Sequence, residues 1–213
     1  MNEIETANRL ADLYVSYRQR YIEARNTHGK PAIYVPRLHG EEKPLNNGML
    51  QSHALQRVAV GVFASPLSSK FITLNISHHD PESVHKVMQG LEDVGFQHDD
   101  IHISTSGKEG YHVEIFFNDL MYTDDLLILY DTVIEAQKLD RRKVEFRPRH
   151  GQAIILPLSK HPKTGNICWF LNRDTLEPIE SADYLLTIHP VEHDRAMELI
   201  REHCCTVEDT EPA

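Results

Sequence analysis

The chain has 213 residues, of which 40% are hydrophobic, so it can form one large domain or two small ones around an ordinary core. No run approaches the roughly 18 apolar residues of a membrane span, and the opening MNEIET is too acidic and polar for a secretory signal. The formal net charge of −10 argues against general coating of nucleic acid, although a local basic patch can override that sign. We expect a folded cytoplasmic protein with no membrane partner.

Cysteine and histidine usage does not predict a metal site. The three cysteines, Cys168, Cys204 and Cys205, fit neither a disulfide framework nor zinc spacing. Fourteen histidines are many for this length, but none has HExxH or mixed Cys/His spacing. The adjacent pair His78 and His79 would point to opposite faces of a strand, so scattered surface histidines are the simpler interpretation.

The first quarter of the chain predicts a helical and irregular extension. Apolar residues at spacings of three and four over residues 3–25, among them Tyr14, Tyr17 and Tyr21, predict one amphipathic helix. Gly, Pro and Asn recur over residues 26–47, which predicts irregular chain with one short strand at 33–35. A short helix near residues 49–55 completes the extension.

Two strands and a helix follow. Residues 58–64 and 71–77 predict strands that flank a Ser-Pro turn, and we expect them to form a hairpin. Alternation in the second strand places Thr73, Asn75 and Ser77 on one face and apolar residues on the other. Asp80 precedes a proline and starts a helix that ends at Gly95, so Asp80 is better explained as a helix cap than as a metal ligand.

The second half continues with alternating strands and helices. Residues 101–104 and 111–117 predict strands joined by the polar loop 105–110, with His112 and Glu114 sharing one face of the second strand. A helix at about 124–139 precedes the basic run 141–149, whose alternation indicates a half-buried strand. Strands at 152–157 and 166–171 flank a polar turn, and a final helix covers 191–204.

These elements predict an α+β fold with a mostly antiparallel sheet, flanking helices and an N-terminal helical extension. We divide the chain into the extension, 1–57, packed on the core; an α+β core, 58–204; and a disordered acidic tail, 205–213.

Two polar segments occur in an order that resembles a known family. The segment SGKEGYH ends at His112 and leads into VEIFF, and the segment LPLSKHPKTG spans residues 156–165. Both resemble motifs of the archaeo-eukaryotic primase superfamily, the primase small subunits and primase-polymerases. In that family glycines precede a histidine that contacts nucleotide phosphate, and basic residues of the later segment approach the triphosphate. The resemblance implies an RRM-derived primase-polymerase fold and assigns nucleotide binding to Ser106, Gly107, His112, Ser159, Lys160, His161 and Lys163.

The N-terminal part resembles the version of this domain found in large mobile-element and conflict-system proteins. The similar segments are YVSYR at residues 14–18 and MLQSHALQRVAVGVF at residues 49–63. With them the resemblance extends over roughly residues 10–180.

The sequence departs from the family at its acidic positions. Family members carry Asp-x-Asp or Asp-x-Glu where this chain has Asn75 and Ser77, and Glu145 is the candidate for a third acid. The family's nucleotidyl transfer uses two divalent cations, and Mg²⁺ requires hard anionic oxygens. The neutral oxygens of Asn and Ser cannot offset its dehydration. We therefore treat Asn75, Ser77 and Glu145 as degenerate catalytic positions with no metal, and expect Mg²⁺ or Mn²⁺ as a cofactor only if the domain is active.

Three hypotheses follow. The first is a catalytically inactive primase-like domain that binds nucleotide and single-stranded or primer-template DNA, in DNA replication or a mobile-element system. Its candidate partner is a replicative helicase or a catalytic primase subunit, and its candidate nucleic-acid contacts are Arg141, Arg142, Arg147 and Arg149. The second is a divergent active primase-polymerase, a nucleotidyltransferase in which Glu114 and Glu145, with Asp80 or His79, recruit Mn²⁺. The third is an assembly protein that kept only the fold, in which the basic residues are merely solvated.

Overall fold

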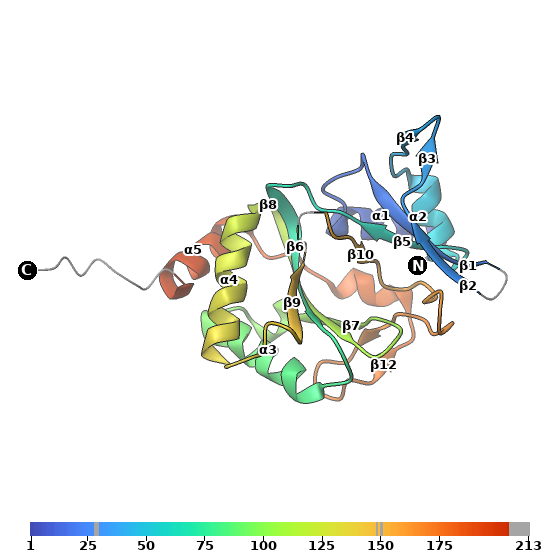
Figure 1. The fold of residues 1–213 in the computed structure, drawn as a ribbon. Helices are drawn as coiled ribbons and strands as arrows, with labels where there is room; N and C mark the ends of the chain where they lie inside the picture. The colour runs from blue at the N-terminus through green and yellow to red at the C-terminus, as the bar shows by residue number, and fades with distance from the viewer. Residues whose placement is uncertain (28–29, 148, 150, 205–213) are drawn as a thin grey trace, which may run out of the picture.

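The computed structural model describes residues 1–27, 30–147, 149 and 151–204 (Figure 1). The predicted tail, 205–213, lies outside the described residues. In chain order the elements are α1 (Glu3–Tyr14), β1 (Tyr21–Thr27), β2 (Lys30–Tyr34), β3 (Arg37–Leu38), β4 (Glu41–Glu42), α2 (Asn47–Ala54), β5 (Ala59–Val62), β6 (Ser68–Ile76), α3 (Pro81–Val94), η1 (His98–Asp100), β7 (His102–Thr105), β8 (Tyr111–Tyr122), α4 (Thr123–Ala136), β9 (Val144–Arg147), β10 (Ile154–Ile155), β11 (Phe170–Leu171), β12 (Pro178–Ile179), η2 (Ala182–Thr187) and α5 (His193–Cys204).

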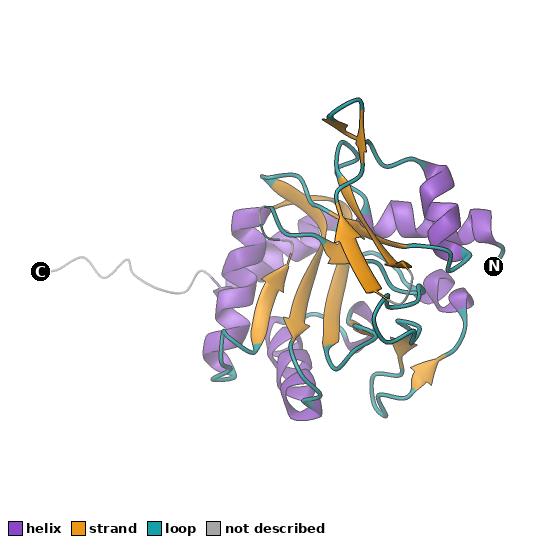
Figure 2. Ribbon diagram, turned by 45° about the vertical axis from the view of Figure 1, so that its right-hand side comes forward, coloured by secondary structure: helices purple, strands orange, loops and turns teal. Residues whose placement is uncertain are grey.

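Two antiparallel sheets form the framework. One has six strands in the order β12-β11-β7-β8-β6-β9, and the other has four in the order β10-β5-β1-β2. Helices α3, α4 and α5 lie together on one side, and α1 and α2 lie beside the four-stranded sheet (Figures 1 and 2). The short β3–β4 ribbon projects beyond that sheet. The predicted α+β architecture with mostly antiparallel strands and flanking helices is confirmed.

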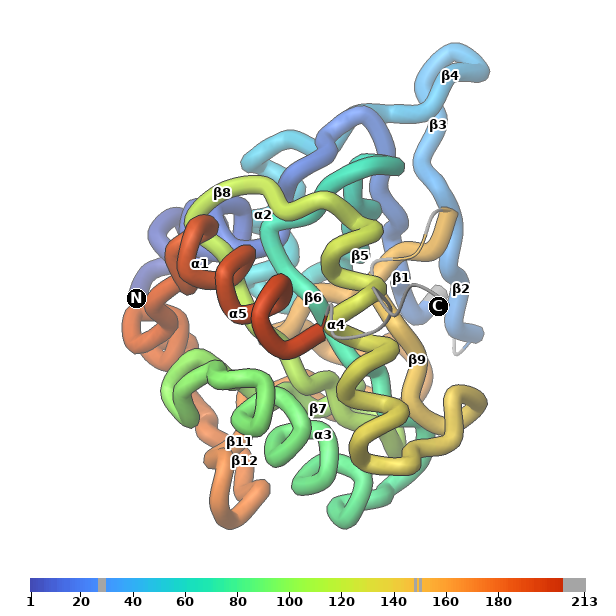
Figure 3. Tube along the Cα trace, turned by 90° about the vertical axis from the view of Figure 1, so that its left-hand side faces the viewer, coloured from blue at the N-terminus to red at the C-terminus, as the bar shows by residue number. Residues whose placement is uncertain are grey.

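The first core fills the space between the six-stranded sheet and α3, α4 and α5, which cover one face of that sheet (Figure 3). The apolar face of β6 enters this core, since Ile72, Leu74 and Ile76 are fully buried. Burying each such side chain contributes roughly 1.5–3 kcal/mol. The alternation predicted for β6 is therefore confirmed, and it leaves the opposite face of the strand for polar residues.

Helix α3 begins and ends where local signals predict. The Asp80 carboxylate accepts hydrogen bonds from the backbone N–H of Ser83 at 3.1 Å and from its hydroxyl at 2.8 Å. Gly95 ends the helix with φ +110°, a left-handed conformation that favours glycine. The prediction that Asp80 is a helix cap is confirmed.

The second core joins α1 and α2 to both sheets. The ring of Tyr14 on α1 lies 5.1 Å from the ring of Phe71 on β6 and 4.9 Å from that of Phe116 on β8, measured between centroids. Aromatic pairs at such separations add stabilisation beyond their buried area. The N-terminal helix is thereby fixed against the polar-faced side of the six-stranded sheet.

The prediction of one helix over residues 3–25 is wrong in its second half. Helix α1 ends at Tyr14, and Val15 already has extended backbone. Tyr21 starts strand β1, is fully buried and lies opposite Val62 of β5. The spacing of the tyrosines fits a helix, but pairing with β5 and β2 satisfies the backbone of this segment in an extended form.

The predicted hairpin of the two strands after residue 58 is also wrong. Strand β5 pairs with β1 and β10 in the four-stranded sheet, whereas β6 pairs with β8 and β9 in the six-stranded sheet. Residues 26–47 are more regular than expected, since β2 pairs with β1 over its whole length. The four-stranded sheet combines strands from both sides of residue 57, and the division of domains there stays a prediction.

The C-terminal third is only partly foreseen. The strands expected at 152–157 and 166–171 shrink to the two-residue strands β10 and β11, while η2 and β12 were not predicted. Helix α5 lies where the final helix was expected. Within the described ranges, no helix is both long and apolar enough to cross a membrane.

Candidate functional site

Two rows of residues cross the six-stranded sheet on the face opposite α3, α4 and α5. The first row, on β7, β8, β6 and β9 in turn, consists of Ser104, His112, Asn75 and Glu145. The second row on the same strands consists of His102, Glu114, Thr73 and Arg147. Residues two apart on a strand share a face, so the rows form one polar surface. The polar face predicted for β6 and β8 is thus one continuous array.

The first row opens into a cavity of about 290 Å³ between the two sheets. Its lining consists of Asn75, His112 and Arg147 from the six-stranded sheet, Ser106 and Lys108 from the loop after β7, Ala153, Ile154 and Ile155 at β10, and His161. A smaller cavity of about 190 Å³ adjoins it, shares Asn75, Ser106 and Lys108, and is also lined by Ser77. One wall is apolar and the other carries cationic and amide groups.

The two segments that resemble nucleotide-binding motifs contact each other at Gly107. The Thr164 hydroxyl donates a hydrogen bond to the Gly107 carbonyl at 2.6 Å. Gly107 has φ +75°, and a Cβ at this position would lie 2.7 Å from both Cys168 Sγ and His161 Cβ. Only glycine allows this approach, so the loop 105–110 and the turn 159–166 form one edge of the cavity.

Thr164 orients the imidazole of His161 at this edge. Both the backbone nitrogen and the hydroxyl oxygen of Thr164 lie close to His161 Nδ1, at 3.2 Å and 3.1 Å. Burial, followed by the charges of Lys108 and Lys163, lowers the pKa of His161 below its usual value. An anion bound in the cavity would oppose the effect of the two lysines.

His112 forms part of the cavity floor and is uncharged. Its side chain is nearly inaccessible, and burial together with the nearby Arg147 guanidinium lowers its pKa to about 4. The imidazole is therefore neutral at physiological pH, with one ring nitrogen as a hydrogen-bond donor and the other as an acceptor.

Glu145 is bound by its neighbours in the sheet. Its Oε2 accepts a hydrogen bond from Asn75 Nδ2 at 3.2 Å and an ion-paired hydrogen bond from the Arg147 guanidinium at 2.7 Å. The Arg147 side chain is only 17% exposed, so this pair is less screened than a surface ion pair. The Ser77 hydroxyl donates to the backbone carbonyl of Lys143 at 3.2 Å.

These residues do not fit the divalent metals that the family resemblance implies. Asn75 and Ser77 supply neutral oxygens, Glu145 is paired with Arg147, and Asp80 caps α3. Across the part of the chain that the structure describes, no three His, Cys, Asp or Glu residues are grouped so that they could hold a metal ion. The surface is suited to binding an anion rather than a pair of cations.

Glu114 in the second row is a buried acid. It is fully inaccessible and accepts hydrogen bonds from the hydroxyls of Tyr14 at 2.9 Å, Thr73 at 3.1 Å and Ser104 at 3.2 Å. Burial raises the pKa of Glu114 to about 7, although the three hydroxyls favour the carboxylate. Glu114 therefore ties α1 to the sheet and does not face the cavity.

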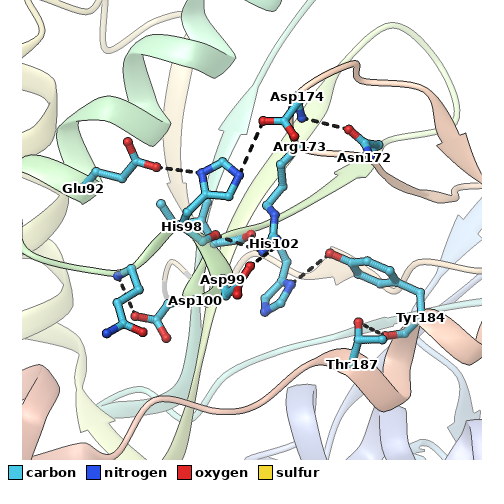
Figure 4. Close-up of polar contacts among 12 residues, drawn as sticks. Glu92, His98, Asp99, Asp100, His102, Asn172, Arg173, Asp174, Tyr184 and Thr187 are labelled. Carbon is cyan, nitrogen blue, oxygen red and sulfur yellow. Dashed lines mark hydrogen bonds and ion pairs between the residues drawn. The ribbon is translucent and has the colours of Figure 1, made fainter.

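His102 closes the same row beside the β11–β12 region. In Figure 4 its ring points toward Tyr184, whose hydroxyl lies 3.1 Å from His102 Nδ1. Burial is the main reason that the pKa of His102 falls to about 3, with the charge of Arg173 next in size. Arg173 in turn binds Asp99 at 2.6 Å. This cluster fastens η1 and β7 to the segment around β12 and lies outside the cavity lining.

The remaining predicted residues are only partly brought to the cavity. Ser159 is fully buried, with its hydroxyl 3.5 Å from the Leu156 carbonyl, and Lys160 and Lys163 are exposed outside the lining. Arg141 pairs with Asp131 and Glu135, Arg142 pairs with Asp140, and Arg149 is exposed. Of this basic run, Arg147 alone lines the cavity, where it was not expected to lie.

Sequence reasoning missed two parts of the lining. Lys108 lies in the same segment as His112, and its position between Gly107 and Gly110 could have predicted a cation in the phosphate-binding loop. Ile154 and Ile155 form the apolar wall, but in sequence they resemble any core strand.

Comparison with solved structures identifies the fold. No protein-family model matches the sequence, and no curated protein matches it either. The polymerase domain of ligase D from Mycobacterium tuberculosis, solved in complex with DNA, aligns with a TM-score of 0.53 at 15% identity, covering 96% of this chain and 92% of that chain. The primase-polymerase domain of cyanophage S-2L aligns with a TM-score of 0.48 at 12% identity, covering 86% of this chain and 89% of that one. The chain has a primase-polymerase fold. At such low identity the likeness establishes the fold alone, and it confirms the fold expected from the two motif segments.

Proposed function

We propose that this primase-polymerase fold binds nucleotide or nucleic acid in the cavity between its sheets and does not catalyse nucleotidyl transfer. The observation that carries the proposal is the lining itself. Lys108, Arg147 and His161 surround a position where Asn75 replaces an expected carboxylate. The cavity thus combines donors for phosphate with an apolar wall for a sugar or base.

Electrostatics favours an anionic ligand. Two unit charges 4 Å apart interact by about 4 kcal/mol at the effective dielectric constant of about 20 that suits partly buried sites. Arg147 is mostly shielded from solvent, while Lys108 at the rim can follow a phosphate. The imidazole of His161 adds a further polar group to the lining, and its contact with phosphate requires no metal.

The proposed lack of catalysis follows from the positions of the two acids Glu114 and Glu145. Nucleotidyl transfer needs carboxylates to hold cations against the phosphates. Glu145 is paired with Arg147, and Glu114 is buried beneath Tyr14. The alternative of a divergent nucleotidyltransferase would need these two acids in the cavity. Primer extension by the wild-type protein with Mg²⁺ or Mn²⁺ would favour that alternative.

Calorimetric titration with ATP and with a single-stranded oligonucleotide tests the proposal. Lys108→Ala and Arg147→Ala should each weaken binding by about tenfold to a hundredfold, because hydrogen bonds to charged groups contribute about 1.5–3 kcal/mol. Lys86→Ala is the matched control, since Lys86 pairs with Glu82 on the helical side. Binding that is equal in all four proteins would refute the site. Absence of binding in the folded wild type would favour a protein that kept only the fold.

Exposed Arg149 is the candidate contact for a longer strand. Arg141 and Arg142 are weaker candidates because they do not line the cavity, and their acidic partners Asp131 and Asp140 lie in and after α4. Longer oligonucleotides should therefore gain affinity over ATP through Arg149, and the gain should fall as salt rises. Comparison of wild type and Arg149→Ala across salt concentrations measures that gain.

A further inference from the structure

Arg147 supplies the positive charge that compensates the carboxylate of Glu145. Its guanidinium lies 2.7 Å from Glu145 Oε2, and its second terminal nitrogen donates to the Phe146 carbonyl at 3.1 Å. The backbone of Arg147 pairs with that of Thr73 in the sheet, which fixes the origin of the side chain. The arginine is therefore built into the cavity floor as a fixed positive charge.

Asn75 completes this arrangement. Its amide donates to the same oxygen of Glu145, at 3.2 Å, that Arg147 contacts. An aspartate at this position would face Glu145 as a like charge, whereas the amide is attracted to it. Arg147 thus neutralises the one acid on the first row, and Asn75 donates a second hydrogen bond to it.

A ligand that carries Mg²⁺ meets this site unfavourably. The ion would bring positive charge toward Arg147 and Lys108, and it would have to compete with Arg147 for Glu145 Oε2. Mg²⁺ dehydrates reluctantly, and the neutral oxygens of Asn75 and Ser77 compensate little. The same phosphate without the ion would offer its full negative charge to both side chains.

We propose that the cavity selects phosphate ligands that are free of metal, so that Mg²⁺ weakens nucleotide binding. The proposal rests on the proposed function and adds the direction in which Mg²⁺ changes nucleotide affinity. Arg147 takes the role of an internal counter-ion, and Asn75 holds Glu145 in place beside it.

Calorimetric titration of the wild-type protein with ATP, once in EDTA and once in excess Mg²⁺, tests the sign. The dissociation constant should be larger in Mg²⁺ by about tenfold, which corresponds to about 1.4 kcal/mol. AMP is the matched ligand, because one phosphate group holds Mg²⁺ far more weakly than a triphosphate chain does. Its dissociation constant should be the same in both buffers.

Variants distinguish the effect of the Arg147 charge from that of the overall charge of the cavity. In Arg147→Gln the ratio of the ATP dissociation constants in Mg²⁺ and EDTA should fall toward one. In the triple variant Asn75→Asp/Ser77→Asp/Arg147→Gln, Mg²⁺ should strengthen binding. Should the triple variant fail to fold by circular dichroism, the single variant decides.

Two results would overturn the inference while leaving the proposed function in place. One is ATP binding to the wild type that is equal or tighter in Mg²⁺. The other is a ratio that Arg147→Gln leaves unchanged. Absence of ATP binding in both buffers would instead overturn the proposed function, and the inference with it.

Discussion

Replacing Glu114 with glutamine should remove a pH-dependent loss of stability. Glu114 is fully buried beneath Tyr14, and burial raises its pKa from 4.5 to about 7. The pKa of this acid is higher in the folded state than in the unfolded chain. Its contribution to stability is therefore fully present below pH 4.5 and is lost as the pH rises through about 7.

The size of this loss follows from the two pKa values. At about 1.36 kcal/mol per pH unit, the gap between 4.5 and about 7 corresponds to about 3 kcal/mol. Glutamine keeps the shape of the side chain and cannot ionise. Relative to the wild type, Glu114→Gln should therefore gain about 3 kcal/mol between acidic and mildly alkaline pH.

Buried histidines change the pH dependence of stability in the opposite direction. The pKa values of His53, His102 and His112 are lowered to about 4, 3 and 4, chiefly by burial. Each adds stability as the pH rises from its folded-state pKa toward 6.5. Because both proteins contain these histidines, their contributions cancel when the variant is compared with the wild type.

Urea unfolding of both proteins at a series of pH values from about 4 to 8 measures the difference in unfolding free energy. The difference should increase steadily with pH in favour of the variant. Thr73→Val is the companion variant: it removes a hydroxyl that favours the carboxylate, so the pKa of Glu114 should rise further and the loss of stability should extend to higher pH. A difference that does not change with pH would refute the assignment of a raised pKa to Glu114.

Three further predictions concern the cavity and its support. Gly107→Ala should destabilise the protein by about 1–3 kcal/mol more than Gly165→Ala, because both glycines have positive φ but of the two only Gly107 lacks space for a Cβ. Gly107→Ala should also weaken nucleotide binding. Urea unfolding measures the first effect and calorimetric titration the second. Since a bound anion raises the lowered pKa of His161, nucleotide affinity should increase as the pH falls into the histidine range, and His161→Gln should lose that dependence in calorimetric titrations. Asp80→Ala should cost about 1 kcal/mol of stability through the lost helix cap, and unchanged ATP affinity would distinguish a cap from a ligand-binding residue.

Local signals in the sequence are sufficient to predict helix ends and the two faces of a strand. The cap, first-turn proline and terminal glycine of α3 all lie between residues 80 and 95, and alternation along β6 assigns Asn75 to a polar face regardless of the rest of the chain. The partners of a strand are not local. Tyr21 fits a helix by spacing, and only the presence of β5 and β2 makes it part of β1.

The site was predictable in its motifs but not in its contacts. The segments ending at His112 and containing His161 were identified, yet their contact through Gly107 depends on how the loops fold. Ser159 shares a segment with His161 but points into the core. The pairing of Arg147 with Glu145 could be expected from their spacing of two on a strand, whereas the role of Asn75 as a third partner requires the register of β6 against β9.

The first polar row also has a consequence for the order of folding. Ser104 and His112 are eight positions apart in the chain and can meet within a local hairpin, but the Asn75–Glu145 contact spans 70 residues. Closing the longer loop carries the larger entropic cost, and β9 joins the sheet only through β6. An intermediate with β7, β8 and β6 assembled would already hold His112 but would lack Arg147. Ligand binding that uses Arg147 would thus require β9 to be paired with β6, and binding would draw the folding equilibrium toward the sheet with β9 in place.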